Sequence, residues 1–506
     1  MPQIDKLIDI AALKGITLDS RAVKSGYLFA ALKGEQVDGR DYIGAAIKNG
    51  ASIVLTDAVY EQPEGLDLGD AILVKSENPA RDISYIAAEF NAPLPEHFVA
   101  VTGTNGKSSV VHFASQLWQK EGVKGVMMGT LTNALTTPDA VTLFEALGIL
   151  KNNDGITHVA IETSSHGLAQ HRADGAPIKI AAFTNFTQDH LDYHESMDEY
   201  FSAKKRLFEE LVPEDGAAVL NADVPSYKEL SDICKRRGVR VISYGEKGED
   251  LTLLEHRVVG VTQEVVVDVM GQRFALSIPF VGAFQVMNML CSLGCLLASS
   301  TDDTERIKTL TEFLPTLQGV PGRLQQVSDP SGAYNGYVDY AHTPDALETV
   351  LNALRPHTKG RLVCVFGCGG DRDSSKRPQM GEIAARLADV AIITDDNPRS
   401  ESPSLIRKEI EDGIPDNFKE QKDIQNIEGR RKAIEQAVAL MQKGDILLLA
   451  GKGHEDGQTI GDKVHPFDDA TELNKALRNR KSTAKQIERN TQKGMSDNLF
   501  ANNKSN

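Results

Sequence analysis

Six short apolar runs in this chain each end in a polar, often glycine-rich loop, and this alternation limits the possible folds. The runs and their loops are Phe98–Val101 before GTNGKSS, Val159–Ile161 before ETSSHG, Ile180–Phe183 before TNFTQDHLD, Leu362–Phe366 before GCGGDRD, Val390–Thr394 before DDNPR and Ile446–Ala450 before GKGHE. Short apolar strands that alternate with helical patterns are typical of parallel α/β sheets. Ligands of such sheets gather at the carboxyl ends of the strands, where all six loops lie. We therefore predict an α/β protein with two nucleotide-binding domains that face a shared cleft.

Length and punctuation suggest how the chain is divided. A chain of 506 residues is too long for one ordinary core, and about three domains are expected. We place the first domain at residues 1–97, closing at the proline-punctuated NAPLPEHF, the second at residues 98–318 and the third at residues 319–480. Residues 481–506 are rich in Lys, Asn, Gln and Ser, a composition that predicts a disordered tail.

Composition excludes several classes of protein. The net charge of −16 argues against a nucleic-acid binder, and no apolar run approaches the roughly 20 residues of a membrane span. Five scattered cysteines form no disulfide framework, and Cys291 and Cys295 are predicted to be buried as small apolar side chains. The N-terminus shows no secretory signal. We expect a cytoplasmic monomer with neither nucleic acid nor membrane as a partner.

The loop at Val101–Ser109 (VTGTNGKSS) has the features of a phosphate-binding loop. It is followed by an apolar helical face, at Val110, Phe113, Ala114, Leu117 and Trp118. Glycines let backbone N–H groups surround phosphate oxygens, Lys107 can reach the terminal phosphates, and Ser108 can offer its hydroxyl to Mg²⁺. The alternative is a glycine-rich turn with an exposed lysine. Because Val101 stands where the standard eight-residue pattern begins with glycine, a generic GTPase or ATPase is less favoured.

Candidate metal ligands follow two neighbouring runs. Glu162 ends one run, and His190 lies in QDHLDYH after the next. Mg²⁺ prefers hard oxygen ligands, so Glu162 beside Ser108 is a suitable pair. His166 and His194 are weaker candidates that could instead bond to a loop. Each residue taken alone could be an ordinary surface residue, but their places at adjacent strand ends favour a site.

The ordered set of motifs resembles the Mur ligase family over nearly the whole chain except the tail. The matching segments are DSRAV, GTNGKSS, LTTPDA, ETSSHGLAQHR, TNFTQDHLDYH, YFSAKKRLF, VLNAD, VGAFQVMN, VPGR, VDYAHTPDAL, FGCGGDRD, KRP, DDNPR and GKGHE. The resemblance implies a small N-terminal α/β domain that binds UDP, a central ATPase-like domain with a phosphate loop, and a C-terminal Rossmann-like domain. It also implies that ATP activates a carboxylate as an acyl phosphate, which an amine then attacks to form an amide.

The resemblance also assigns the ATP and metal sites. It places ATP against Gly103, Thr104, Asn105, Gly106, Lys107, Ser108, Ser109, Asn288, Arg323 and Asp339. It makes Lys107, Glu162, His190 and Lys204 catalytic, with Mg²⁺ held by Ser108, Glu162, His190 and Lys204. Lys204 matches a lysine that the family carbamylates with CO₂ to N6-carboxylysine, whereas its position alone suggests a helix-surface lysine like Lys205. Serines replace the commoner threonines in GKSS, which keeps the hydroxyl chemistry.

The carboxylate substrate implied by the resemblance is UDP-MurNAc-L-Ala-D-Glu. Its contacts would be Ser20 at the UDP end and Thr136, Thr137, Ser164, Gln170 and Arg172 along the muropeptide. Arg40 in DGRDY stands where the family more often has histidine. Arginine can still meet a diphosphate, but that contact is in question.

The incoming amino acid is expected to be meso-diaminopimelate. Its second carboxylate calls for a bidentate cation, and Arg399 in DNPR offers one. The other implied contacts are Arg372, Asn397, Gly451 and Glu455. The alternatives are addition of L-lysine, another ligase of the same fold such as a folylpolyglutamate synthase, a regulatory NTPase that acts through partner binding, and an inactive nucleotide-binding scaffold.

Overall fold

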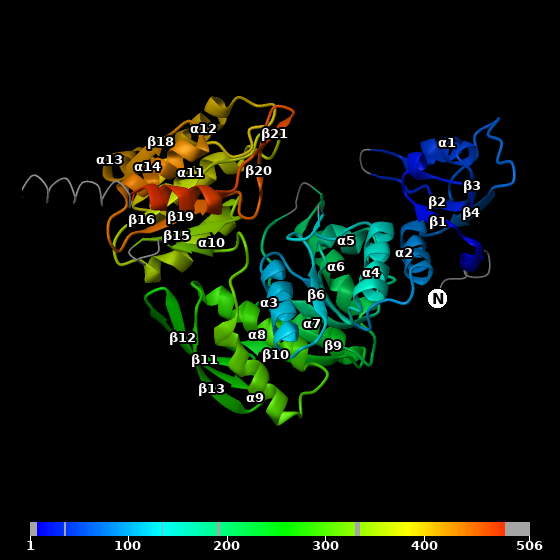
Figure 1. Cartoon of the computed structure of the whole chain (residues 1–506), viewed down its shortest axis with the longest axis horizontal. Coiled ribbons are helices and arrows are strands. Elements are labelled where there is room, and N and C mark those ends of the chain that lie inside the picture. Colours follow the sequence, from blue (N-terminus) through cyan, green and yellow to red (C-terminus); the bar gives the residue numbers. More distant parts are fainter. Residues whose placement is uncertain (1–7, 35–36, 134, 190–192, 329–333, 481–506) are drawn as a thin grey trace, which may run out of the picture. The chain divides into compact units, whose positions relative to one another are not determined.

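The computed structural model describes residues 8–34, 37–133, 135–189, 193–328 and 334–480 (Figure 1). The predicted metal ligand His190 and the predicted tail at 481–506 lie outside the described residues. Contacts between Cα atoms group the chain into two compact units, the larger with Met1–Glu255, Val265–Leu276 and Phe284–Leu317, the smaller with His256–Glu264, Ser277–Ala283 and Gln318–Asn506.

The first sheet is small and entirely parallel. Its strands lie in chain order: β1 (Gly15–Thr17), β2 (Tyr27–Ala30), β3 (Ala51–Asp57) and β4 (Ile72–Ser76). Two helices accompany it, α1 (Ile43–Lys48) and α2 (Pro79–Phe90). Helix α2 begins where a proline follows the capping residue Asn78, whose Oδ1 accepts from Arg81 N at 3.0 Å. It packs against α4 of the following sheet.

The second sheet has nine strands in the order β13-β12-β11-β10-β9-β8-β5-β7-β6. From β6 to β11 the neighbouring strands are parallel. The strands are β5 (His97–Thr102), β6 (Gly125–Met128), β7 (His158–Glu162), β8 (Ile178–Phe183), β9 (Ala217–Asn221), β10 (Arg240–Gly245), β11 (Leu251–Val259), β12 (Thr262–Val269) and β13 (Gln272–Ile278). The three apolar runs predicted here coincide with β5, β7 and β8.

Among the described residues, seven helices connect or follow these strands. They are α3 (Lys107–Lys120), α4 (Ala140–Asp154), α5 (Ser165–Ala169), α6 (Met197–Arg206), α7 (Tyr227–Arg236), α8 (Ala283–Leu297) and α9 (Thr304–Phe313). A π turn at Leu207–Leu211 continues α6. The predicted apolar face of α3 is buried, with Val110, Phe113, Ala114 and Leu117 at 0% exposure. Cys291 and Cys295 are buried in α8, as predicted.

The third sheet has the order β14-β15-β19-β16-β17-β18, and only β14 runs antiparallel to its neighbour. Its strands are β14 (Gln325–Ser328), β15 (Asn335–Asp339), β16 (Leu362–Phe366), β17 (Val390–Ile393), β18 (Asp423–Asn426) and β19 (Ile446–Ala450). The helices are α10 (Pro344–Leu354), α11 (Lys376–Leu387), α12 (Pro403–Asp412), α13 (Asp416–Gln421), α14 (Arg430–Leu440) and a final helical stretch at 469–480. A separate hairpin joins β20 (Gly457–Ile460) to β21 (Lys463–Pro466).

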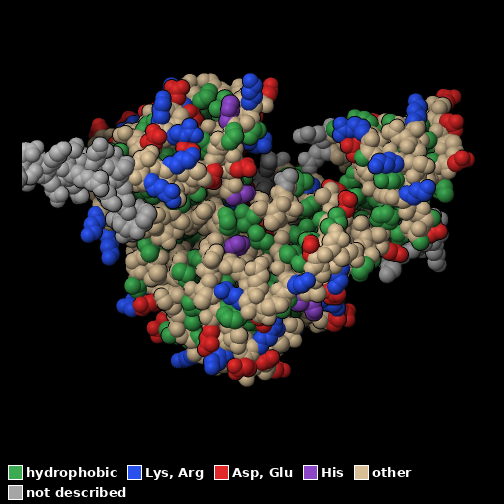
Figure 2. All heavy atoms as spheres, in the orientation of Figure 1, with side chains coloured by type: hydrophobic (Ala, Val, Ile, Leu, Met, Phe, Trp, Pro, Cys, Tyr) green, Lys and Arg blue, Asp and Glu red, His purple; other side chains and the backbone are tan. Residues whose placement is uncertain are grey.

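The central strands β16 and β19 are buried along their whole length, as expected for parallel strands covered on both faces. Short 3₁₀ turns lie at Ile10–Ala12, Ser20–Ala22, Gly39–Tyr42, Leu314–Thr316 and Arg355–His357. Within the described ranges, no helix is long and apolar enough to cross a membrane. Figure 2 shows acidic and basic side chains interspersed on the visible face.

Candidate active site

The phosphate loop connects β5 to α3 and depends on two glycines in the left-handed region. Gly103 has φ 142° and Gly106 has φ 89°. A Cβ atom on Gly103 would lie 1.9 Å from Thr184 Oγ1, and one on Gly106 would lie 2.5 Å from Asn288 Oδ1. Side chains at these two positions would therefore clash as well as strain the backbone.

Neighbouring segments hold the loop in place. The backbone N–H of Thr104 donates to Asn185 O at 2.9 Å, and that of Asn105 donates to Asn185 Oδ1 at 2.8 Å. Lys107 Nζ folds back onto the loop, donating to Gly103 O at 3.0 Å and to Thr104 O at 2.7 Å. The predicted phosphate-binding lysine is thus hydrogen-bonded to the backbone of the loop that would surround the phosphates. Ser109, also predicted to contact ATP, is buried in the first turn of α3.

Ser108 and Glu162 form the oxygen pair expected for a metal site. Glu162 is the last residue of β7 and is 1% exposed. Its Oε2 accepts from Ser108 Oγ at 3.0 Å, and its Oε1 accepts from Thr130 N at 2.9 Å. No cluster of three His, Cys, Asp or Glu side chains suited to a metal occurs among the described residues. Two protein oxygens still fit Mg²⁺ bound with ATP, which keeps several waters and takes phosphate oxygens as ligands.

Lys204 lies inside the protein, so the interpretation as a helix-surface lysine is wrong. It is 1% exposed, and its Nζ donates to Gly103 O at 2.8 Å and lies 4.4 Å from the centre of the Tyr200 ring. Its neighbour Lys205 instead pairs with Glu229 at 3.1 Å. Burial lowers the pKa of Lys204 well below its usual value, and the nearby charge of Lys107 lowers it further. A lowered pKa increases the fraction of neutral amine, which is the form that reacts with CO₂.

The weaker histidine candidates belong to an aromatic cluster. The His166 ring lies 3.9 Å from that of Tyr193 and 5.6 Å from that of His194, measured between centroids. His194 is 1% exposed and also packs on Tyr200, with centroids 5.2 Å apart. His194 Nδ1 also lies 3.7 Å from Glu199 Oε1.

Most of the residues predicted for the muropeptide are linked by hydrogen bonds beside Glu162. Thr137 Oγ1 donates to Glu162 O at 2.9 Å and accepts from Ser164 N at 3.0 Å. Arg172 Nη1 donates to Thr137 O at 2.6 Å, and Arg172 Nε donates to Gln170 Oε1 at 3.0 Å. Four of the six predicted residues are therefore connected directly.

The two remaining predicted muropeptide residues make contacts elsewhere. Thr136 Oγ1 is 3.0 Å from Thr130 Oγ1. Ser20 lies on the first sheet's domain, where its carbonyl accepts from Asn49 Nδ2 at 2.9 Å. The unusual Arg40 is engaged by Asp38 and Asp57, with 2.9 Å between Arg40 Nη1 and Asp57 Oδ2. A diphosphate contact by Arg40 would therefore compete with two carboxylates.

Three predicted nucleotide contacts lie outside the loop. Asn288 is buried on α8 and donates through Nδ2 to Gln285 Oε1 at 3.1 Å. In the third sheet's domain, the carboxylate of Asp339 accepts from Leu324 N at 2.7 Å and from Ala341 N at 2.8 Å. These two hydrogen bonds link the VPGR turn to the end of β15 through Asp339. Burial raises the pKa of the Asp339 carboxyl. The Arg323 guanidinium stacks 4.5 Å from the centre of the Tyr340 ring.

The predicted amino-acid site gathers around a buried lysine. Lys452 is 0% exposed, and its Nζ donates to Asn397 Oδ1 at 3.1 Å and to Glu455 Oε2 at 2.9 Å. Asn397 Nδ2 also donates to Glu455 Oε2, at 2.9 Å. Gly451 has φ 119°, and its backbone lies close to Asp396: a Cβ atom at this position would be 3.2 Å from Asp396 Oδ2.

Two arginines complete the predicted set for the amino acid. Arg399 has φ 50° and donates through Nη1 to Gly370 O at 2.7 Å. Its backbone pairs with the β20–β21 hairpin, donating to Thr459 O at 3.2 Å. Arg372 is exposed and donates to Asp371 O at 3.1 Å. Arg399 is therefore held by hydrogen bonds to two other segments, whereas Arg372 extends from the surface.

Two residues of these sites were missed in the sequence. Thr130 supports Glu162 through its backbone N–H, a contact that no side-chain motif could reveal. Lys452 lies in the GKGHE loop, in which the predicted contacts are Gly451 and Glu455. A lysine between two glycines directly after an apolar strand was the available signal for it.

Comparisons with known proteins cover nearly the whole chain. Three family models match in order: "Mur ligase family, catalytic domain" at residues 12–89, "Mur ligase middle domain" at residues 101–296, and "Mur ligase, glutamate ligase domain" at residues 322–453. The sequence is 46% identical to UDP-N-acetylmuramoyl-L-alanyl-D-glutamate–2,6-diaminopimelate ligase of Caulobacter vibrioides, covering 92% of this chain and 95% of the relative. It is 42% identical to the protein of the same name from Zymomonas mobilis, covering 92% and 94%.

Solved structures agree with the sequence matches. A structure of a ligase with that same name aligns with a TM-score of 0.67 and 32% identity, covering 92% of this chain and 95% of the other. The MurF ligase of Thermotoga maritima, solved in complex with ADP, shares the fold with a TM-score of 0.62, at 18% identity and covering 94% and 100%. Sequence relatives, family models and structures thus agree in order and extent, and the chain belongs to the Mur ligase family, with its three-domain α/β architecture.

Proposed function

We propose that the chain is an ADP-forming ligase that adds meso-2,6-diaminopimelate to the D-Glu γ-carboxylate of UDP-MurNAc-L-Ala-D-Glu. The observation that carries this proposal is the 46% identity, over 92% of the chain, to a relative named for that reaction. We place the reaction in the cytoplasmic synthesis of peptidoglycan precursors, carried out by a monomer. The domain limits proposed are 1–97 for UDP binding, 98–318 for ATP and 319–480 for the amino acid.

ATP and Mg²⁺ are the proposed co-substrate and cofactor. The loop from Gly103 to Ser109 supports ATP binding, because its two glycines have positive φ and the loop leads directly into the N-terminus of α3, a position that favours phosphate. Ser108, Glu162, His190 and carbamylated Lys204 are the proposed metal ligands. Mg²⁺ bound there would neutralise charge on the phosphates during transfer. Arg323 and Asp339 remain proposed nucleotide contacts.

The proposed chemistry has two steps. An oxygen of the D-Glu γ-carboxylate attacks the γ-phosphorus of ATP, the bond to ADP breaks, and an acyl phosphate forms. The amine of diaminopimelate then attacks the acyl carbon, and the tetrahedral intermediate loses phosphate and a proton to leave an amide. Lys107 would hold the transferred phosphoryl group, while Thr137, Ser164, Gln170 and Arg172 would orient the carboxylate.

Carbamylation of Lys204 fits its surroundings. The neutral Nζ attacks the carbon of CO₂, a nitrogen–carbon bond forms, and one proton is released, which leaves an anionic carbamate. The charge of Lys107, which disfavours an ammonium at Lys204, would favour this anion. A lysine placed in this way gains an oxygen ligand for metal that an amine cannot provide.

Arg399→Ala tests the choice of amino acid. We expect kcat/KM for meso-diaminopimelate to fall about 10- to 150-fold, because a charge-assisted bond of about 1.5–3 kcal/mol to the second carboxylate is lost. The KM for ATP should stay within about twofold, since Arg399 belongs to the amino-acid side. Steady-state kinetics with each substrate varied in turn would measure both. Arg386→Ala is the matched control, because it removes the same side chain from an exposed position. Within the described part of the chain, the ion pairs of Arg386 are with Glu348 and Glu382.

An equal loss for ATP and diaminopimelate in Arg399→Ala, or no loss at all, would contradict this role for Arg399. The function as a whole is tested by phosphate release from ATP with UDP-MurNAc-L-Ala-D-Glu and either meso-diaminopimelate or L-lysine. Release that requires meso-diaminopimelate supports the proposal. A preference for lysine would identify a lysine-adding ligase, and release without any amino acid would indicate a regulatory NTPase.

A further inference from the structure

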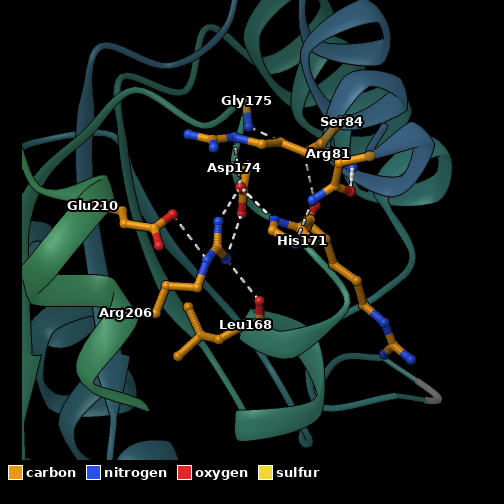
Figure 3. Close-up of polar contacts among 10 residues, drawn as sticks. Arg81, Ser84, Leu168, His171, Asp174, Gly175, Arg206 and Glu210 are labelled. Atoms are coloured by element: carbon orange, nitrogen blue, oxygen red, sulfur yellow. Dashed lines mark hydrogen bonds and ion pairs between the residues drawn. The ribbon is translucent and has the colours of Figure 1, made fainter. Parts of the chain in front are cut away.

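The buried carboxylate of Asp174 is a hub, because it contacts Arg81 of α2, Arg206 of α6 and His171 in the loop after α5 (Figure 3). Its side chain is 1% exposed, and Oδ1 accepts from Arg206 Nη1 at 3.0 Å. Oδ2 accepts from Arg206 Nη2 and, at 2.9 Å, from His171 Nδ1, while Arg81 Nε lies 3.6 Å away. Burial alone would raise the pKa of Asp174, but the hydrogen bonds from His171 and Arg206 outweigh it and lower the pKa. The Asp174 carboxylate therefore favours its charged form.

Arg206 connects this hub to the helix that carries Lys204. It is the last residue of α6, and its Nη1 also donates to Leu168 O in α5 at 2.7 Å, as Figure 3 shows. Its Nε donates to Glu210 Oε2 at 3.1 Å. Lys204 lies in the same final turn and reaches Gly103 O of the phosphate loop. A fixed Arg206 therefore fixes the rotation and axial position of the turn from which Lys204 extends.

His171 connects the hub to the muropeptide segment and to α2. The amide Nδ2 of Asn78 is a donor, so its 2.9 Å contact makes His171 Nε2 the acceptor. His171 Nδ1 then carries the proton and donates to Asp174. His171 lies between the proposed muropeptide contacts Gln170 and Arg172 and has φ 56°. Ser84 of α2 adds a further link, because its Oγ accepts from Gly175 N at 3.0 Å.

We propose that Asp174 is a positioning residue of the ligase: its carboxylate holds α6 and the segment 168–175 in register, so that Lys204 and Arg172 keep a fixed placement. The inference rests on the proposed function, because it concerns the carbamate on Lys204 and the muropeptide contact of Arg172. Asp174 itself touches neither the phosphate loop nor the predicted substrate-contact side chains in any contact described. Its effect is transmitted through Arg206 and His171.

The test compares Asp174→Asn with Glu210→Gln in the full-length chain. Both remove one carboxylate from Arg206, but Glu210 is 42% exposed and lies on the same helical stretch, so its loss leaves α6 bonded to the 168–175 segment. For Asp174→Asn we expect kcat to fall about 10- to 100-fold and the KM for UDP-MurNAc-L-Ala-D-Glu to rise, because small misplacements are costly in catalysis. Glu210→Gln should stay within about twofold, as exposed ion pairs contribute little.

A second readout follows the modification directly. With ¹³C-labelled bicarbonate, the carbamate resonance in NMR should be weaker in Asp174→Asn than in the wild type at the same bicarbonate concentration. Glu210→Gln should match the wild type, and Lys204→Met should show no resonance. More bicarbonate should restore part of the activity of Asp174→Asn.

Arg206→Lys provides a test if Asp174→Asn does not fold. It keeps the charge but loses the bidentate contact, so it should show the same shifts in KM and in carbamate signal. Wild-type KM and wild-type carbamate signal in the folded variants would overturn the inference, even with a lowered melting temperature. A wild-type chain that forms no tripeptide would instead refute the proposed function, whatever the variants show.

Discussion

Lys204→Met is expected to lower kcat for tripeptide formation by roughly 100- to 1,000-fold, the loss typical when one preorganised charge is removed from a transition state. Methionine has a similar volume and no amine, so the buried space near Gly103 stays filled while carbamylation becomes impossible. The measurement is kcat at saturating ATP, UDP-MurNAc-L-Ala-D-Glu and meso-diaminopimelate, with the melting temperature recorded alongside.

Lys205→Met is the matched control for this substitution. Lys205 is the next residue along α6, yet it extends toward Glu209 and Glu229 at the surface. Surface substitutions of this kind change stability by no more than about 0.5 kcal/mol, so kcat should hardly change. Equal activity in the two variants would show that Lys204 is only a buried structural residue.

Glu162→Gln is the second substitution with a large expected effect. Glutamine keeps the shape of the side chain and can still accept from Thr130 N, but it provides no anionic ligand for Mg²⁺. We expect kcat to fall roughly 100- to 1,000-fold and the Mg²⁺ concentration for half-maximal activity to rise. A titration of activity against Mg²⁺ measures both quantities.

The control for Glu162→Gln is Glu145→Gln, which removes the same charge from an exposed position on α4. It should leave the Mg²⁺ dependence unchanged. If Glu162→Gln lost activity without any shift in Mg²⁺ dependence, Glu162 would be supporting the loop near Thr130 rather than the metal.

Local patterns were sufficient to predict the strands that lead into the site loops. The apolar runs at Leu362–Phe366 and Ile446–Ala450 coincide with β16 and β19, because buried parallel strands must be apolar on both faces. The face of α3 was readable because helical spacing repeats along a short stretch of chain. The phosphate loop was readable for the same reason, since strand, glycines and helix follow one another directly.

Contacts between distant segments could not be read in the same way. Lys204 and Lys205 are adjacent and chemically identical, and only the packing of α6 shows that the first is buried and the second half-buried. Asp174 depends on Arg206, 32 residues away, and His171 depends on Asn78, 93 residues away. Such pairs leave no periodic signal in a single sequence. Lys452 could not be predicted because a lysine between two glycines in a loop is as compatible with an exposed side chain as with a buried one.

The proposed reaction joins meso-diaminopimelate to the D-Glu γ-carboxylate of UDP-MurNAc-L-Ala-D-Glu. The most direct measurement is mass spectrometry of the product formed from UDP-MurNAc-L-Ala-D-Glu, ATP and Mg²⁺ with meso-diaminopimelate and L-lysine at equal concentrations. We expect a single UDP-MurNAc-tripeptide that carries diaminopimelate, formed together with one ADP per amide. A product that carries lysine, or ADP released without any tripeptide, would contradict the proposed reaction.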